Sequence, residues 1–249
     1  MISLKSRREI ECMRTAARIL GAALDKVGKA VKPGISTKEL DQIAEDVILS
    51  SGAAAAFKGY RGFPAAICAS INDEVVHGIP SKRCLSEGDI FSVDVGVFYN
   101  GYYSDAARTF PVGEVKSEAR GLIEATQGSF YAGIDAIQPG AHLGDLSAAI
   151  QNYAESRGFS IVRDFVGHGI GSELHEDPQI PNFGKPGTGP LLENGMTLAI
   201  EPMVNIGTWQ VKVQDNQWTV VTADGSLSSH YENTIAIIDE KVEILTEWG

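Results

Sequence analysis

The chain has 249 residues, of which 43% are hydrophobic, and a formal net charge of −11. This length allows one large domain or two small ones, and the acidic balance argues against nucleic acid or an anionic membrane as the main partner. No apolar run approaches the roughly eighteen residues that a membrane span requires. The basic N-terminal segment is followed by acidic residues and not by an apolar region, so we do not expect a signal peptide. Three cysteines without metal-ligand spacing predict a reducing, cytoplasmic setting.

Two helices are expected first. Apolar residues recur every three or four positions over residues 10–31, which predicts an amphipathic helix that Pro33-Gly34 ends. Ser36 and Glu39 have the spacing of a capping box, so a second helix should begin there and stop near Gly52. A loop over residues 58–64 and a strand over 65–72 are expected to follow.

Residues 89–110 predict a β-hairpin around Asn100-Gly101, because a type I′ turn needs positive φ at both central positions. Since side chains alternate along a strand, Asp94 and Asp105 should be diagonal neighbours on one face. Two carboxylates placed so close repel each other unless a cation lies between them, although the alternative is a hairpin whose aspartates face water. The turn would set three facing pairs: Tyr99 with Tyr102, Gly96 with Asp105, and Asp94 with Ala107.

The second half repeats the plan of the first. A predicted helix over residues 119–138 ends at Pro139-Gly140, and another ends at Gly158. Residues 85–94 align with residues 192–201, which places Asp94 on Glu201. This pattern favours a single domain, residues 1–249, built from two similar α+β halves at about 7–110 and 117–238. The alternative is chance similarity of two helix–breaker–helix segments.

Three residues of the second half are further ligand candidates. His168 lies in a glycine-rich segment that lacks the lysine and the setting of a phosphate-binding loop. Glu201 ends a predicted strand just before Pro202, so its carboxylate is free to leave the sheet. Glu232 lies near the start of an apolar strand, where a buried carboxylate needs a partner. Each residue alone also suits a structural role in the core or at a solvated rim.

Together the candidates form a set of four carboxylates and one imidazole: Asp94, Asp105, His168, Glu201 and Glu232. Oxygen-rich ligation with one histidine and no thiolate suits divalent Mn, Fe, Co or Zn. Four carboxylates are too many for one catalytic ion but suit two ions about 3.5–4 Å apart, bridged by carboxylates and by a water or hydroxide. The set therefore predicts a dinuclear metal site.

This ligand series resembles the metal site of the bacterial type I methionine aminopeptidases. The resemblance extends over essentially the whole chain, through the motifs at residues 72–80, 94–105, 167–171, 175–178, 200–202 and 231–234. It implies the pita-bread α+β fold, in which two pseudo-symmetric halves surround a dinuclear centre. It also implies removal of the initiator methionine from nascent proteins, with a preference for a small second residue.

The resemblance also implies a role for individual residues. His77 and His175 match two histidines that do not bind metal but contact the scissile peptide and stabilise the tetrahedral intermediate. Glu201 matches the glutamate that takes the proton from the bridging water, which attacks the scissile carbonyl. These roles are chemically sensible, since hydrogen-bond donors stabilise developing charge. The positions that match the methionine pocket are Phe57, Tyr60, Phe63, Cys68, Leu174 and Trp218.

Four residues depart from the family pattern. Phe57 replaces a residue that is often small, and Leu174 stands where an aromatic residue is common. His230 and Asn233 flank Glu232 where glutamine and histidine are frequent. Because the ligands are unchanged, these departures concern the shape of the pocket and the surroundings of the metal ions, not the reaction class. Phe57 taken alone also suits a plain core position.

Two alternative functions fit the sequence less well. Proline-specific aminopeptidases, prolidases and creatine amidinohydrolase share the fold but need an additional N-terminal domain, for which 249 residues leave no room. Peptide- or histone-binding relatives keep the fold without enzymatic activity, but they lose metal ligands that this chain retains. We expect a cytoplasmic monomer that acts on the N-terminal methionine of nascent polypeptides, with transient ribosome contact and without direct nucleic-acid recognition or membrane association. Which metal is used stays open.

Overall fold

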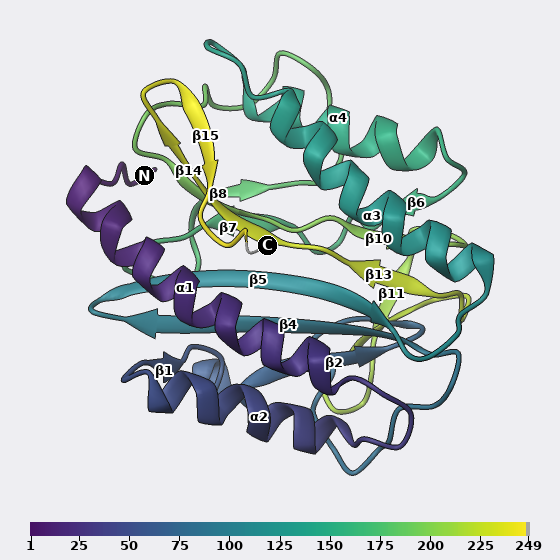
Figure 1. The fold of residues 1–249 in the computed structure, drawn as a ribbon. Coiled ribbons are helices and arrows are strands. Elements are labelled where there is room, and N and C mark those ends of the chain that lie inside the picture. The colour runs from purple at the N-terminus through teal and green to yellow at the C-terminus, as the bar shows by residue number, and fades with distance from the viewer. Residues whose placement is uncertain (248–249) are drawn as a thin grey trace.

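The computed structural model describes residues 1–247, so the predicted domain end at residue 249 lies outside the described part. Two pairs of helices cover two sets of strands (Figure 1). The first pair, α1 (Arg7–Ala30) and α2 (Thr37–Ser50), packs on the first half of the chain. The second pair, α3 (Ser117–Asp135) and α4 (Leu143–Glu155), packs on the second half. No helix within residues 1–247 is long and apolar enough to cross a bilayer.

The helix starts follow from local capping. Ser36 and Glu39 cap α2 reciprocally, as predicted, with the Ser36 amide 2.9 Å from the Glu39 carboxylate. The same capping box, formed by Ser6 and Glu9, starts α1 at Arg7, three residues before the predicted start. The third helix spans Ser117–Asp135 instead of the predicted 119–138, and Gln138 lies outside it, as the restriction on the residue before a proline requires.

The central hairpin has the predicted register. Strands β4 (Ile90–Tyr99) and β5 (Tyr102–Pro111) pair antiparallel, and all three predicted facing pairs are confirmed. The turn residues have the required left-handed backbone, with φ of 49° at Asn100 and 86° at Gly101. Asp94 and Asp105 therefore lie on one face of the hairpin, as expected.

The remaining strands form antiparallel sheets around this hairpin. In the first sheet, β4 also pairs with β1 (Ala54–Ala55) and β2 (Ile67–Ile71). The five-stranded sheet of the second half has the order β15-β14-β9-β7-β8, with bounds Lys241–Ile244, Asn233–Ile238, Thr197–Ile200, Gly167–Gly169 and Glu176–Ile180. Two small sheets have the orders β13-β10-β6 (Ser228–His230, Met203–Asn205, Ser160–Ile161) and β11-β12-β3 (Val211–Val213, Val220–Thr222, Glu74–Val76). Mixed helices and antiparallel strands agree with the predicted α+β class.

The two halves meet along β5 and the start of β14. Ala107 and Glu232 exchange backbone hydrogen bonds of 3.3 and 3.0 Å. Nearby, the Thr234 hydroxyl accepts from the Asp105 amide and donates to the Asp105 carbonyl, both at 2.9 Å. These bonds hold the strand that carries Asp105 directly against the segment that carries Glu232.

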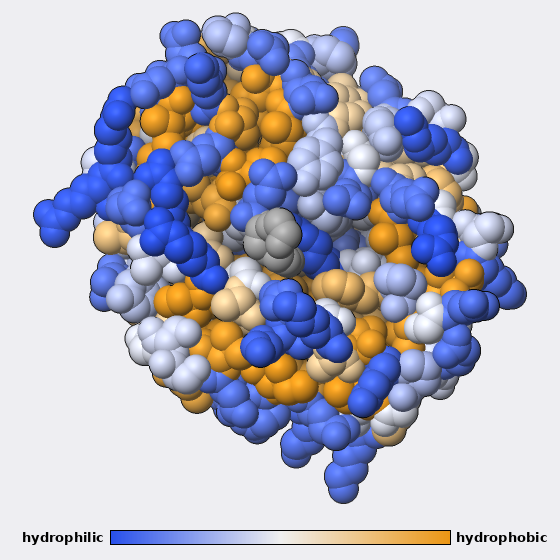
Figure 2. All heavy atoms as spheres, viewed as in Figure 1, coloured by the Kyte–Doolittle hydropathy of each residue, from blue (hydrophilic) through white to orange (hydrophobic). Residues whose placement is uncertain are grey.

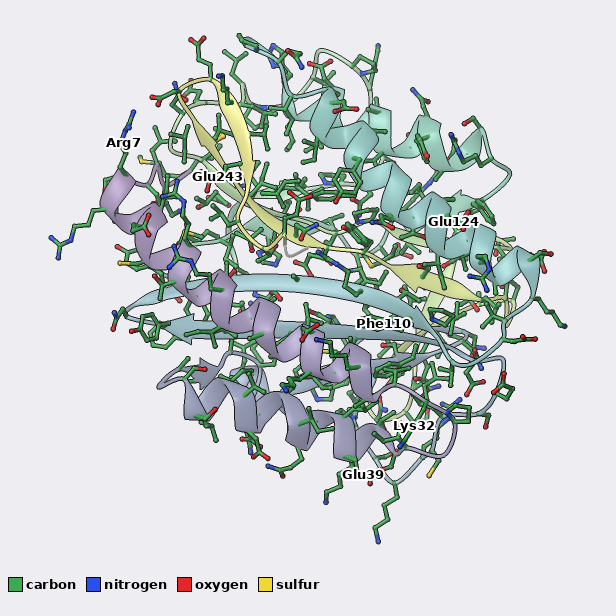
Figure 3. All side chains as sticks on the ribbon, in the orientation of Figure 1. Arg7, Lys32, Glu39, Phe110, Glu124 and Glu243 are labelled. Atoms are coloured by element: carbon green, nitrogen blue, oxygen red, sulfur yellow. The ribbon has the colours of Figure 1, made fainter. Side chains whose placement is uncertain are left out.

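The first helix contacts both halves. Its buried face belongs to the core of the first half, with Leu20 and Leu24 fully buried. Its outer side reaches β15, which carries Glu243 (labelled in Figure 3). The Arg14 guanidinium lies 2.6 and 2.7 Å from the two carboxylate oxygens of Glu243. The helix thus ties the C-terminal hairpin, formed by β14 and β15, to the first half.

On the face seen in Figure 2, hydrophilic side chains project at the outline and hydrophobic ones lie between them.

Candidate metal centre and active site

One cavity, of about 130 Å³, is lined by all the residues that the sequence analysis assigned to the site. It brings together the five predicted ligands, the two predicted catalytic histidines and the six predicted pocket positions. Small-molecule sites usually have about 300–1,000 Å³, so this cavity has room for one residue rather than for an extended peptide.

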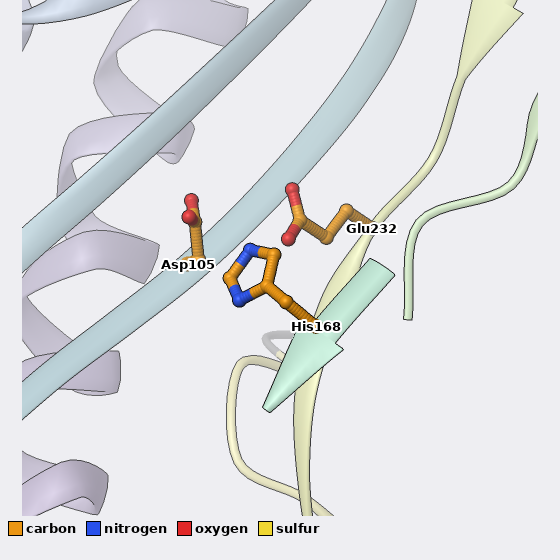
Figure 4. A group of neighbouring side chains, drawn as sticks. All are labelled: Asp105, His168 and Glu232. Carbon is orange, nitrogen blue, oxygen red and sulfur yellow. The ribbon is translucent and has the colours of Figure 1, made fainter. Parts of the chain in front are cut away.

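Three of the predicted ligands converge most closely. Asp105, His168 and Glu232 each offer one ligand atom, and these atoms lie within 4.8 Å of one another (Figure 4). Asp105 comes from β5, His168 from β7 and Glu232 from the segment before β14. All three are buried, which favours metal binding over solvation as the reason for their proximity.

The orientation of His168 leaves one ring nitrogen available. Its Nδ1 lies 2.9 Å from the Gly169 carbonyl, so Nδ1–H donates and Nε2 presents a lone pair. Nε2 lies 3.7 Å from the Glu201 carboxylate. The flanking glycines are required, because a Cβ on Gly167 would lie 2.4 Å from the Ala199 carbonyl oxygen, and one on Gly169 would lie 2.1 Å from that of Asp177.

Glu201 and Glu232 lie one residue outside the strands in which they were predicted. Glu201 follows β9, and its carbonyl accepts a hydrogen bond from the Asn182 side chain at 2.9 Å. Glu232 directly precedes β14. Because both residues lie outside the strands, their carboxylates turn toward the cavity that Asp94 and Asp105 also line. The alignment of Asp94 with Glu201 predicts this convergence of acidic residues.

The four carboxylates repel one another in a place from which water is largely excluded. Burial raises the pKa of Asp94 to about 7. Burial, and next the charge of Glu232, raises the pKa of Asp105 well above its usual range. The pKa values of Glu201 and Glu232 are raised by burial and then by neighbouring carboxylates. Bound cations would reverse these shifts.

Several buried oxygens lack the partners that burial requires. Asp94 Oδ1, Asp105 Oδ1 and Glu232 Oε1 have no hydrogen-bond partner within the described residues. A buried oxygen without a partner costs roughly 1–3 kcal/mol, more when it is charged. Oxygen atoms in this arrangement, with one imidazole nitrogen, are the donor set of a hard or borderline divalent ion, so the residues fit the predicted metal ions.

The raised pKa values predict how the metal-free protein responds to pH. Because these carboxyl groups hold protons more tightly in the folded state than in the unfolded chain, their stabilisation is present at low pH and lost as pH rises through about 7. We expect the Tm of the metal-free protein to fall by ~5 °C or more between about pH 5 and pH 8. Saturating Mn or Co should remove this fall. Calorimetry after dialysis against a chelator measures both effects.

The control for this experiment is Asp94→Asn, which removes one titrating group and should make the decline shallower. A Tm of the metal-free wild type that stays level or rises over the same range would contradict the electrostatic account of the site.

His77 has an unusual backbone at the edge of the cavity. It follows β3 with a φ of 60°, a left-handed conformation that is uncommon for residues other than glycine. Its ring meets the edge of Phe165 at 5.8 Å and lies 6.5 Å from the Trp218 ring. Burial lowers the pKa of His77 to about 4, so the imidazole is neutral at pH 7. A neutral, held imidazole that lines the cavity can donate one hydrogen bond to a substrate.

His175 is oriented by Tyr60. The Tyr60 hydroxyl lies 2.9 Å from His175 Nδ1, and the two rings stack with centroids 5.3 Å apart. A hydroxyl that donates to Nδ1 leaves the proton on Nε2, which is then available as a donor. The His175 ring also lies 4.1 Å from that of His168, so it adjoins the predicted metal ligands.

The predicted pocket residues adjoin the carboxylates directly. Cys68 faces Asp94 across the β2–β4 pairing, so the two side chains share a face of the sheet. Burial raises the pKa of the Cys68 thiol well above its usual value, which keeps it protonated. Phe63 packs edge-on against Trp218 at 5.1 Å, and Leu174 is buried. One wall of the cavity is therefore apolar and the other is acidic.

Arg61 was not predicted at the site, whereas His230 was predicted only in the surroundings of the metal ions. Arg61 lines the cavity, and no sequence pattern indicated this. His230 places its Nε2 at 3.7 Å from Glu201 and 3.9 Å from Glu232. The sequence contained a signal for His230, since residues two apart in an extended chain point to the same side.

Comparison with known proteins identifies the family. The sequence profile of metallopeptidase family M24 matches residues 11–239. The methionine aminopeptidase of Clostridium acetobutylicum is 58% identical over 247 residues, which cover 99% of both chains. The chain belongs to the methionine aminopeptidases of metallopeptidase family M24.

Other methionine aminopeptidases agree with this membership. Methionine aminopeptidase 1 of Bacillus subtilis is 52% identical over 99% of both chains. The crystal structure of the methionine aminopeptidase from Thermotoga maritima matches with a TM-score of 0.98 at 48% identity, over the full length of both chains. The prolidase from Pyrococcus furiosus, at 23% identity, shares the fold with a TM-score of 0.79 over 99% of this chain and 66% of its own. The predicted pita-bread fold is thus confirmed.

Proposed function

We propose that this M24 chain is a dinuclear metallopeptidase that removes the N-terminal methionine from nascent polypeptides. The observation that carries the proposal is the convergence of four buried carboxylates and one oriented imidazole in a cavity with room for one residue. Membership among the methionine aminopeptidases supports the same substrate.

Five residues would hold the two divalent ions. Asp94, Asp105, Glu201 and Glu232 supply carboxylate oxygens, and His168 supplies Nε2. Their raised pKa values and buried, unpartnered oxygens support this assignment. When bound, the ions would polarise the scissile carbonyl and lower the pKa of a bound water molecule. Mn, Fe, Co and Zn all suit the donor set.

The remaining roles belong to side chains that line the same cavity. Glu201 accepts the proton of the attacking water, for which a carboxylate beside both His168 and the other acidic residues is suitably placed. His77 and His175 donate hydrogen bonds to the scissile peptide as negative charge develops on its oxygen. The contact between Tyr60 and His175 supports a fixed donor direction for His175.

Substrate selectivity should follow from the apolar wall. Phe57, Tyr60, Phe63, Cys68, Leu174 and Trp218 offer dispersion and sulfur–aromatic contacts to an unbranched thioether. An apolar pocket distinguishes one methylene by about 1–3 kcal/mol, so norleucine should be accepted and shorter aliphatic residues disfavoured. The small cavity volume supports a preference for a small second residue.

A panel of Met-Xaa-Ser tripeptides tests the proposed function. We expect hydrolysis when Xaa is Ala or Gly and poor hydrolysis when it is Leu or Lys, because the second residue must approach the crowded carboxylates. Initial rates with added Mn or Co measure this preference. Equal rates for small and bulky second residues would refute the selectivity, and faster cleavage of Leu- or Lys-initiated peptides would refute the methionine pocket.

We further propose that the protein acts as a single-domain monomer in the cytoplasm, with transient contact to the ribosome and with residues 7–110 and 117–238 as related halves. Three unpaired cysteines support a reducing compartment. Each half contains a helix pair followed by antiparallel strands, which supports the internal repeat.

A further inference from the structure

His230 is held rigidly behind the metal-binding carboxylates. It ends β13, where it pairs with Met203, and only 2% of its surface is exposed. The Thr109 hydroxyl donates to its carbonyl at 2.9 Å and accepts from its amide at 3.0 Å. Since Thr109 lies on β5, the strand that also carries Asp105, the position of His230 is tied to the same framework as the ligands.

The Nε2 nitrogen of the His230 ring lies near two carboxylates. Nε2 is buried without a hydrogen-bond partner among residues 1–247. It lies 3.7 Å from Glu201 Oε2 and 3.9 Å from Glu232 Oε2. His230 is not among the described residues that line the cavity, so it approaches the glutamates from outside the space where substrate and ions would bind.

A buried ring nitrogen without a partner is unfavourable, whereas a charge-assisted hydrogen bond to a carboxylate is stabilising. The observed distances exceed a hydrogen bond by about 0.5–1 Å, which a small rotation of either glutamate side chain would close. Both glutamates supply ligand oxygens in the proposed function. A donor behind them would restrain the direction in which they present those oxygens.

We propose that His230 is a positioning residue for the metal centre: its Nε2–H donates to Glu201 and Glu232 and holds both carboxylates in their ligating orientation. This inference rests on the dinuclear site of the proposed function. It assigns His230 no contact with substrate and no bond to an ion.

The test compares variants that keep or remove the donor. His230→Gln retains an N–H group, whereas His230→Phe and His230→Leu do not. Metal-depleted proteins are titrated with Mn by calorimetry, and bound Co is followed by its visible absorption. We expect both donor-free variants to bind metal ~10–100-fold more weakly than the wild type. His230→Gln should restore most of the lost affinity.

The matched control is Ser229→Ala, which removes a 3.1 Å hydrogen bond to Thr109 from the same strand but leaves the carboxylates untouched. The Ser229→Ala variant should bind metal as tightly as the wild type. A thermal melt of each variant without metal shows which variants fold. If a folded His230→Phe or His230→Leu binds Mn as tightly as the wild type, the inference is overturned. It is also overturned if His230→Gln fails to restore affinity and the Co spectrum changes, because His230 would then be a ligand itself. A wild type that binds no divalent ion would instead overturn the proposed function.

Discussion

Asp105→Asn should remove most of the bound metal and nearly all turnover while leaving the fold intact. The substitution keeps the size of the side chain but replaces a charged oxygen that lies within 4.8 Å of ligand atoms on both His168 and Glu232. The backbone of Asp105 remains bonded to Thr234, so the junction between the halves is preserved. We expect metal affinity to fall by more than about 100-fold. This exceeds the loss of about 10–100-fold that is typical when a residue that only hydrogen-bonds to a metal ligand is replaced.

Elemental analysis of the purified variant and its rate on a Met-Ala-Ser peptide measure these losses, and a thermal melt checks the fold. Asp25→Asn is the control, because Asp25 lies in an exposed ion pair with Lys29 on α1, and such pairs contribute little. Wild-type metal content and rate in Asp105→Asn would refute the assignment of the metal site.

His77→Ala should depress kcat by roughly 10²–10³, the loss seen when a donor to a developing oxyanion is removed. Burial keeps the imidazole neutral at pH 7, and its left-handed backbone places it at the edge of the cavity. Because His77 is not among the residues proposed to bind metal, the metal content should stay near that of the wild type. Steady-state kinetics and elemental analysis on the same preparation separate the two effects.

His142→Ala serves as the matched histidine control. His142 caps the start of α4, with its Nδ1 2.9 Å from the Gly189 carbonyl, and it does not line the cavity within the described residues. Its replacement should cost some stability but leave kcat unchanged. If His77→Ala lost metal in step with activity, His77 would be part of the metal site and its proposed role would be wrong.

Local signals account for what the sequence predicted well. The Asn100-Gly101 turn determines the hairpin register through backbone geometry alone, so the shared face of Asp94 and Asp105 follows from the sequence of the hairpin. The capping box at Ser36 is equally local. Predicting that the five candidate ligands converge required the internal alignment and the family resemblance, because separate segments of the chain supply them.

Contacts between distant segments could not be predicted from local patterns. Cys68 faces Asp94 because β2 pairs with β4, and Tyr60 reaches His175 across more than a hundred residues of sequence. The sequence placed His230 beside Glu232, but only the pairing of β13 with β10 shows that its ring faces Glu201 as well. Such contacts depend on strand pairing over long sequence separations, for which local propensity carries no information.

The junction between the two halves has a consequence for biosynthesis. The first half carries Asp94 and Asp105, whereas His168, Glu201 and Glu232 follow later in the chain, and Glu232 reaches Asp105 only through the bonds that join β5 to β14. A ribosome-bound fragment that ends before Glu232 therefore contains part of the acidic cluster but cannot close the cavity around it. The proposed active site is therefore complete only when nearly the whole polypeptide has been synthesised. A chain still being synthesised has no complete site with which to process itself or its neighbours.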